Sequence, residues 1–206
     1  MSDDLKYSSW IHSGFFSGLQ KLSVPLSGLF ITMILAHKAL NKQEMGVWAL
    51  FMTITSIIEL IRQGLVKTAL IKFINSNSEE DHKYIVGAAF FLNSIITIIT
   101  ALLIFFFTPF LAYFFKAPQL ESMLYLLQLG LVMMIPFSHF EWLMYSKILF
   151  KGLFWTYFFR QGATLGIVFI IFLINKKISL NSLVIIYDIG LLVGAIVSYG
   201  YIKKEV

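Results

Sequence analysis

The sequence predicts an all-α membrane protein that crosses the bilayer six times, and three observations support this prediction. Hydrophobic residues make up 58% of the 206 residues, and charged residues make up only 13%. A soluble domain carries about twice that share of charge, roughly one residue in four. The mean hydropathy is +0.81. The apolar residues also gather into six runs, each reaching the roughly 20 residues that a transmembrane helix needs.

These six runs follow one another with short polar loops between them, so residues 1–206 are expected to form a single six-helix transmembrane lobe. The expected spans are residues 13–36, 46–74, 84–107, 119–145, 152–175 and 179–202. Pro25 and Pro136 fall inside spans and remove backbone hydrogen bonds, so the first and fourth spans should bend. Glycines spaced four apart should let helices approach closely. Three such pairs occur: Gly14/Gly18, Gly162/Gly166 and Gly190/Gly194.

The ends of the spans predict the orientation of the chain. Four tryptophans lie at or near span ends, as residues at the membrane interface do: Trp10, Trp48, Trp142 and Trp155. With six spans, both termini share one side, which carries Lys6, Lys72, Lys83, Lys147, Lys151, Lys203 and Lys204. The opposite side carries Lys38, Lys42, Lys116, Lys176 and Lys177. Because cytoplasmic loops are richer in lysine and arginine, this excess predicts cytoplasmic termini.

The second span carries four polar residues inside an apolar run: Glu59, Arg62, Gln63 and Lys67. Their spacing of three to four residues places them on one face of a helix, as a single polar stripe. A charged side chain at membrane depth costs about 3 kcal/mol even on lenient scales, and usually faces a protein interior or a watery cavity. The second span is therefore predicted to line a path or a binding site.

Two further cations, Lys21 and Arg160, lie inside the first and fifth spans. With cytoplasmic termini, both would lie about 12 Å from the cytoplasmic face, and Arg62 about 18 Å from it. Three helices would thus bring cations to a similar layer of the membrane. One interpretation of this layer is a water-filled, cationic cavity that accepts an anionic head group.

The other interpretation is charge pairing between helices, and the two are compatible. Glu59 would pair with Arg62 three residues away, and Arg160 with Asp188 or Glu141 on another helix. Lys67 is expected to extend its ammonium group toward the cytoplasmic face.

No motif in the chain indicates an enzyme. The loops are too short for a soluble catalytic domain, and neither a glycine-rich phosphate loop nor a nucleophile elbow is present. The histidines have no zinc-ligand spacing, and the chain has no cysteine. We therefore expect no catalytic residue, metal or cofactor, and no nucleic acid as a partner.

Two stretches of the chain carry a family resemblance. Gln43–Leu50 carries an acidic residue, Glu44, and a glycine, Gly46, in its first half, and Arg62–Phe73 has a glycine followed by small and basic residues. Phe140–Phe154 and Tyr157–Gly162 follow further along. The first two segments resemble the second helix, and the last two the junction of helices four and five, of polysaccharide-repeat (O-antigen type) flippases. These belong to the multidrug/oligosaccharidyl-lipid/polysaccharide exporter superfamily, whose members have two six-helix lobes or more, whereas this chain looks like one N-terminal lobe.

The resemblance implies a function, a location and partners. Such flippases move undecaprenyl-pyrophosphate-linked oligosaccharides across the bacterial inner (cytoplasmic) membrane by rocking two lobes, for the synthesis of surface polysaccharides such as lipopolysaccharide. The expected partners are the lipid-linked oligosaccharide, the bilayer, and a second lobe or a second copy of the chain. The expected substrate-binding residues are Arg62, Lys21 and Arg160 on the pyrophosphate, Glu59 and Gln63 beside them, and Lys67 where the substrate enters.

Two alternatives remain open at this point. A cation-coupled multidrug exporter of the same superfamily would use buried carboxylates to carry a proton or sodium, although intramembrane lysine and arginine would repel a cationic drug. A non-transporting membrane subunit, or an inactive half-transporter, would use the same charges only to hold its helices together.

Overall fold

The computed structural model describes the backbone of residues 2–175 and 177–205, and the side chains of residues 14–37, 39–174 and 177–203. The fold is all-α, with 93% of the chain in helices and no strand in the part described. The elements are α1 (Ser2–Ile34), η1 (Leu35–Ala39), α2 (Lys42–Arg62), η2 (Gln63–Lys67), α3 (Thr68–Ser76), α4 (Glu79–Phe114), α5 (Gln119–Ser146), α6 (Phe150–Asn175) and α7 (Leu180–Glu205). The two η elements are short π-helical turns.

Six helical stretches are long and apolar enough to cross a membrane, which confirms the predicted fold class. They are Gly14–His37, Lys42–Ser76, Glu79–Phe114, Gln119–Ser146, Phe150–Ile174 and Leu180–Lys203. The order and positions agree with the expected spans, and α2, η2 and α3 together make the second span. The main difference is α4, which continues to Phe114 instead of ending near residue 107. The chain is a multi-pass membrane protein.

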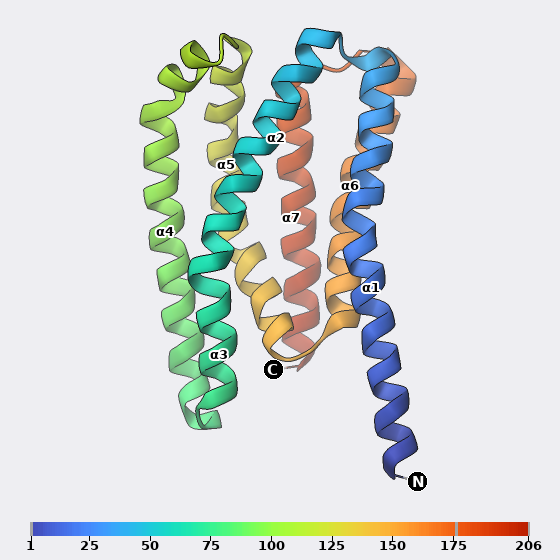
Figure 1. Ribbon diagram of the computed structural model, residues 1–206, viewed down its shortest axis with the longest axis vertical. Helices are drawn as coiled ribbons and strands as arrows, with labels where there is room; N and C mark the ends of the chain where they lie inside the picture. The colour runs from blue at the N-terminus through green and yellow to red at the C-terminus, as the bar shows by residue number, and fades with distance from the viewer. Residues whose placement is uncertain (1, 176, 206) are drawn as a thin grey trace.

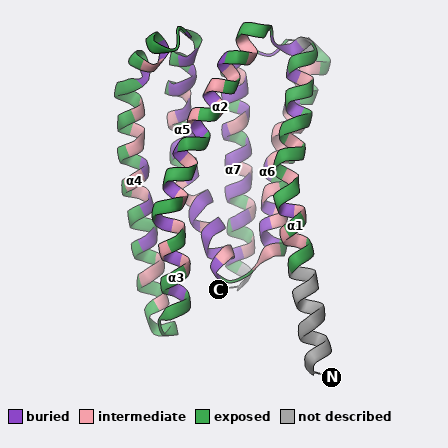
Figure 2. Ribbon diagram, viewed as in Figure 1, coloured by how far each residue is buried: buried purple, intermediate pink, exposed green. Residues whose placement is uncertain are grey.

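Helices α5 and α7 form the centre of the bundle (Figure 1). They pack against each other, with α4 against α5, α6 against α7, and α1 against α6. Helices α5 and α7 are the most buried spans, with 44% and 50% of their apolar stretches buried, whereas α1 and α4 are largely exposed (Figure 2). Both termini lie at the same end of the bundle, as the even number of spans predicts. Helix α2 packs on α4 and α5, away from α1 and α6, and this separation leaves a groove between α1 and α2.

Two glycines on α7 allow this helix to pack closely against α5 and α6 at the centre of the bundle. A Cβ atom added to Gly194 would lie 2.8 Å from the ring of Phe137, and one added to Gly190 would lie 3.1 Å from the backbone oxygen of Arg160. This glycine pair therefore allows the close packing that its spacing predicted. For the other two pairs the prediction is wrong, because an added Cβ would have nothing within 4 Å at Gly14, Gly18, Gly162 or Gly166.

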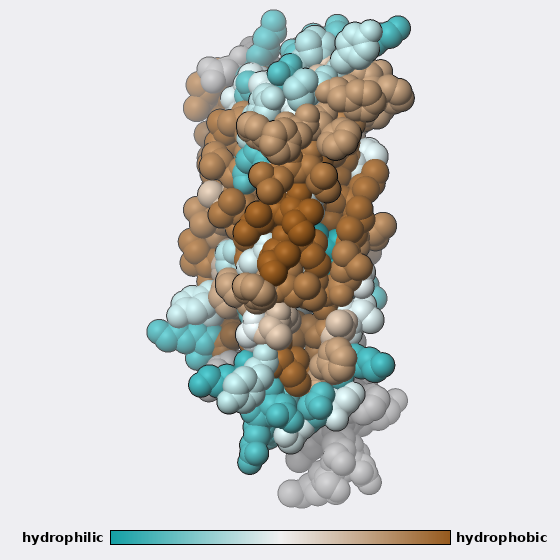
Figure 3. Space-filling view, turned by 90° about the vertical axis from the view of Figure 1, so that its left-hand side faces the viewer, coloured by the Kyte–Doolittle hydropathy of each residue, from teal (hydrophilic) through white to brown (hydrophobic). Residues whose placement is uncertain are grey.

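The outer surface suits a lipid environment. The face formed by α4 and its neighbours presents a broad hydrophobic belt between hydrophilic ends (Figure 3). Exposed aromatic side chains such as Phe91, Phe106 and Tyr113 contribute to it. Trp142 does not, and its predicted interfacial role is wrong: its side chain is fully buried, in a hydrophobic cluster that also holds Val66 and Leu70 of the second span. Outside the described side chains lie Trp10 and four of the counted lysines, Lys6, Lys38, Lys176 and Lys204.

Three helices continue through a proline: α1 through Pro25, α4 through Pro109 and α5 through Pro136. Helix α5 changes course about half-way along its length (Figure 1), as expected where a proline removes a hydrogen bond.

The close contact at Gly194 generates the first prediction. Gly194→Ala should lower the free energy of unfolding by about 1–3 kcal/mol, because the added methyl group must displace the ring of Phe137. Gly166→Ala is the matched control, since its methyl group meets open space and alanine favours the helix. Thermal unfolding in lipid nanodiscs compares the two variants. Equal stability of the two would show that α7 does not need the small residue.

The second prediction concerns orientation, and single cysteines test it because the chain contains none. Ser78 lies in the exposed turn between α3 and α4, and Lys177 is exposed before α7. With cytoplasmic termini, a membrane-impermeant maleimide applied to intact cells should label Lys177→Cys, but label Ser78→Cys only after permeabilisation. The reverse pattern would overturn the orientation.

Candidate functional site

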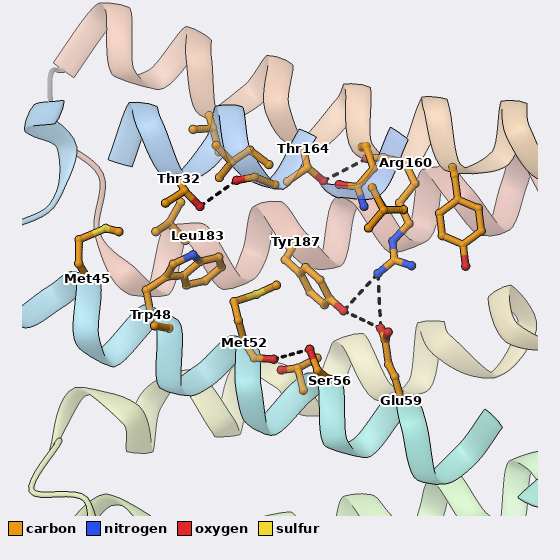
Figure 4. Close-up of a pocket in the computed structure, with 18 of the residues that line it drawn as sticks. Thr32, Met45, Trp48, Met52, Ser56, Glu59, Arg160, Thr164, Leu183 and Tyr187 are labelled. Carbon is orange, nitrogen blue, oxygen red and sulfur yellow. Dashed lines mark hydrogen bonds and ion pairs between the residues drawn. The ribbon is translucent and has the colours of Figure 1, made fainter. Parts of the chain in front are cut away.

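A groove of about 600 Å³ lies between α1 and α2, with side chains of α6 and α7 forming its floor. Its two ends differ in chemistry (Figure 4). The polar end is lined by Gln20, Lys21, Glu59, Arg160, Gln161 and Tyr187. The other end is lined mainly by apolar side chains, among them Met45, Trp48, Met52, Val168 and Leu183. The groove thus combines a charged end with a hydrophobic end.

Three side chains from three helices meet at the polar end. A guanidinium nitrogen of Arg160 on α6 lies 3.5 Å from the carboxylate of Glu59 on α2. The hydroxyl of Tyr187 on α7 donates a hydrogen bond of 2.9 Å to the same carboxylate oxygen, and Arg160 donates one of 3.2 Å to that hydroxyl. Figure 4 shows this triangle. Arg160 is 8% exposed, and its guanidinium also lies over the ring of Phe137 at 4.7 Å.

A second cluster lies nearer the termini, away from the apolar end. The ammonium group of Lys67 lies 3.9 Å from the carboxylate of Glu141, which is buried. Tyr157 donates a hydrogen bond of 2.8 Å to this carboxylate. Lys67 also lies over the ring of Tyr145 at 3.6 Å, and the Tyr145 hydroxyl donates to the side-chain oxygen of Gln20 at 3.3 Å. Because Tyr157 and Gln20 also line the groove, the two clusters are neighbours.

Arg62 lies outside the groove. Its side chain is 1% exposed and reaches between α4 and α5. One terminal nitrogen donates to the side-chain oxygen of Asn93 at 2.9 Å and to the backbone oxygen of Met134 at 3.4 Å. The Asn93 amide in turn donates to the backbone oxygen of Ile135 at 3.1 Å. Arg62 is therefore part of a buried network that joins α2, α4 and α5.

The structure corrects the expectation of a single polar stripe along the second span. Residues three apart on a helix differ in direction by about 60°. That difference is enough for Glu59 to face the groove while Arg62 faces α4 and α5. Gln63 begins the π-helical turn η2 and borders a small internal cavity of about 10 Å³, beside Arg62 and Glu141. Of the six predicted site residues, Lys21, Glu59 and Arg160 line the groove, and Arg62, Gln63 and Lys67 do not.

The charge pairs also differ from the predicted ones. Glu59 pairs with Arg160 and not with Arg62, and Arg160 accordingly pairs with neither Asp188 nor Glu141. Lys67 does not extend toward the surface as expected, because Glu141 and the ring of Tyr145 offer it partners inside the bundle. Asp188 instead lies against Gly130 of α5, where only a glycine leaves room for its carboxylate.

Sequence reasoning missed the residues that complete these clusters. Tyr157 and Thr164 lie three residues before and four residues after Arg160, so helical spacing places all three on one face of α6. The signal that could have found Asn93 is its position as an amide within the long apolar run of α4. Tyr187 precedes Asp188 directly, and no sequence pattern around it indicates a role in the site.

The arrangement can bind an anion next to an apolar group. Two cations and one carboxylate line the groove, and tyrosine hydroxyl and glutamine amide groups surround them. Among the described residues, no group of three histidine or acidic side chains could hold a metal ion.

The buried network of Arg62 generates a prediction about stability. Asn93→Leu should lower the free energy of unfolding by about 1–3 kcal/mol, because it removes the shorter of the two hydrogen bonds of a buried guanidinium. The double variant Arg62→Met/Asn93→Leu should be more stable than Asn93→Leu alone, because the charge is removed with its partner. Ser94→Ala is the control, since this exposed hydroxyl bonds only within its own helix. Thermal unfolding gives the ranking, and an unchanged Asn93→Leu variant would contradict the role of the network.

Comparison with known proteins identifies the family. A family model described as polysaccharide biosynthesis protein matches residues 34–206, which include the groove-lining residues of α2, α6 and α7. No curated protein and no solved structure matches the chain. The family match covers well over half of the sequence. The chain therefore belongs to the polysaccharide biosynthesis protein family, and is a multi-pass membrane protein with a part in polysaccharide synthesis or export.

Proposed function

We propose that the protein moves a lipid-linked oligosaccharide with an anionic phosphate or pyrophosphate across the bacterial inner membrane, with its own termini in the cytoplasm. The observation that carries this proposal is the groove with Lys21 and Arg160 at its polar end, in a chain of the polysaccharide biosynthesis family. In this role the chain supplies a binding surface and performs no covalent chemistry.

The charges at the polar end suit a phosphate group. Bringing a phosphate from water into a low-dielectric region is costly unless opposite charges compensate it. Arg160 can bind two phosphate oxygens at once with its planar guanidinium, whereas the exposed Lys21 offers a mobile point charge on the facing helix. Gln161, beside them, can hydrogen-bond a sugar hydroxyl.

The carboxylate of Glu59 pairs with the guanidinium of Arg160, the same group that would bind the phosphate. When a phosphate binds, Arg160 exchanges one anionic partner for another, so its charge stays compensated throughout. The Tyr187 hydroxyl keeps a hydrogen bond to the Glu59 carboxylate during this exchange. The empty groove is thus stable without exposing an unpaired buried cation.

Movement of the substrate needs a second wall opposite the groove. We propose that a second six-helix unit, either another copy of this chain or a separate lobe, supplies it, so that rocking of the two units exposes the polar end to each side in turn. A multidrug exporter fits the polar end less well, because two cations against one carboxylate disfavour a cationic drug.

Neutralising the pair of Arg160 and Glu59 distinguishes substrate binding from a structural ion pair. Arg160→Gln should abolish the display of surface polysaccharide, and Arg160→Lys should restore it in part, because lysine lacks the bidentate geometry. The double variant Glu59→Gln/Arg160→Gln should stay inactive although both charges have been removed together. Display is measured in cells without the native gene, at matched membrane levels of each variant.

Lys203→Gln serves as the control for loss of one positive charge, because Lys203 is exposed and lies outside the groove. Its display should equal that of the unmodified protein. Full display from the double neutral variant would overturn the proposal and leave Arg160 and Glu59 as a structural pair.

A further inference from the structure

The apolar end of the groove offers no charged side chain to a phosphate. On α2 it runs from Met45 through Trp48 to Met52, and Gly28 and Ile31 face them from α1. The indole of Trp48 is held in place by stacking on the ring of Phe51, with ring centroids 5.4 Å apart. Figure 4 shows Met45, Trp48 and Leu183 at one end and Glu59, Arg160 and Tyr187 toward the other. The groove is therefore a single surface with two kinds of lining.

The order of these linings across the membrane follows from the directions of the helices. Helix α1 leads away from the end of the bundle that holds the termini, and α2 leads back toward it. Lys21 precedes Thr32 on α1, and Glu59 follows Met45 on α2, so the polar end lies nearer the termini on both walls. From Glu59 to Met45 the groove extends about 21 Å along α2, at 1.5 Å per residue. The apolar end therefore leads from the polar end toward the face opposite the termini, because Met45 lies three residues after the start of α2 at Lys42. A lipid whose head group lies at the polar end and whose chain points away from the termini has the same order.

The wall at α1 leaves room for a chain. Gly28 is exposed and lines the groove, and a Cβ atom added to it would meet nothing within 4 Å. Hydrophobicity alone does not drive a hydrocarbon chain from the bilayer into such a groove, because the bilayer is equally apolar. A chain that is covalently attached to a bound phosphate is different, because the head group holds it beside the groove at high effective concentration.

We propose that the apolar end of the groove binds the first part of the polyprenyl chain of the same lipid whose phosphate lies at Lys21 and Arg160. This inference rests on the proposed function and adds a chain subsite to it. Head group and chain would then bind along one continuous surface. Lys21 and Arg160 select a lipid with an anionic head group. The chain attached to that head group then occupies the apolar end of the groove.

Photo-crosslinking in lipid nanodiscs tests the subsite. The probe is a polyprenyl pyrophosphate with a diazirine in the first part of its chain, and a phosphatidylcholine with a diazirine in its acyl chain reports contacts of bulk lipid. The prenyl probe should modify the segments around Gly28–Thr32 and Trp48–Met52, and an excess of unlabelled polyprenyl pyrophosphate should prevent this. Peptide mass spectrometry locates the adducts.

Two glycines of α1 provide matched variants. Gly28→Phe should reduce the groove adducts to the level of the phosphatidylcholine probe, because the ring fills the groove. Gly18→Phe should leave them unchanged, because Gly18 also has open space around it but does not line the groove. Equal labelling of the groove by both probes, or groove adducts that persist in Gly28→Phe, would overturn the chain subsite.

A separate readout distinguishes this failure from failure of the proposed function. Inorganic pyrophosphate should reduce crosslinking of the prenyl probe by competing for the head-group site, and this competition should be lost in Arg160→Gln. Both results report binding of the head group alone. If both are observed while the adducts lie outside the groove, the chain subsite is wrong and the head-group site stands. If neither is observed and no groove adduct forms, both proposals fail.

Discussion

Arg160 is a nearly buried guanidinium at membrane depth, and the need to compensate its charge shapes the rest of the groove. The compensating carboxylate comes from Glu59 on the opposite side, and Tyr187 joins the two. Helix α2 otherwise packs on α4 and α5, whereas α6 packs on α1 and α7. The pair therefore joins α2 to α6 and α7, helices with which α2 makes few other contacts. The paired side chains lie at the polar end of the groove between α1 and α2.

Helix α5 receives polar side chains from two neighbours at the point where it bends. Arg62 from α2 and Asn93 from α4 donate to the backbone oxygens of Met134 and Ile135, directly before Pro136. Pro136 removes the N–H that would bond the carbonyl of Val132, so Met134 and Ile135 accept these donors with carbonyl oxygens that the proline has not freed. The buried guanidinium of Arg62 thus finds its partners next to the proline of α5. Arg62 holds α2, α4 and α5 in register, while Arg160 faces the groove.

The sequence predicted the fold well because long apolar runs leave a membrane helix few alternatives. All six spans were predicted in order, and three of the six predicted site residues, Lys21, Glu59 and Arg160, line the groove. Partners across helices could not be predicted, because a charge at a given depth has several possible counter-charges and rotation of the helix decides among them. Glu59 illustrates this: its nearest charge in the sequence is Arg62, yet its partner is Arg160, about 100 positions away. Glycine spacing failed for a related reason, because it cannot show which face meets another helix.

The length of α4 has a consequence for the surrounding lipid. The helix has no charged residue from Tyr84 to Phe115, and a stretch of that length extends about 48 Å, compared with roughly 30 Å for the hydrocarbon core of a typical bilayer. The excess must be accommodated by tilting of the helix, by the aromatic side chains at its ends residing among the head groups, or by local thickening of the bilayer. Helix α4, at one edge of the bundle, therefore creates a positive hydrophobic mismatch on one side of the protein. The thickness of the membrane therefore influences the tilt of α4 relative to the bilayer normal.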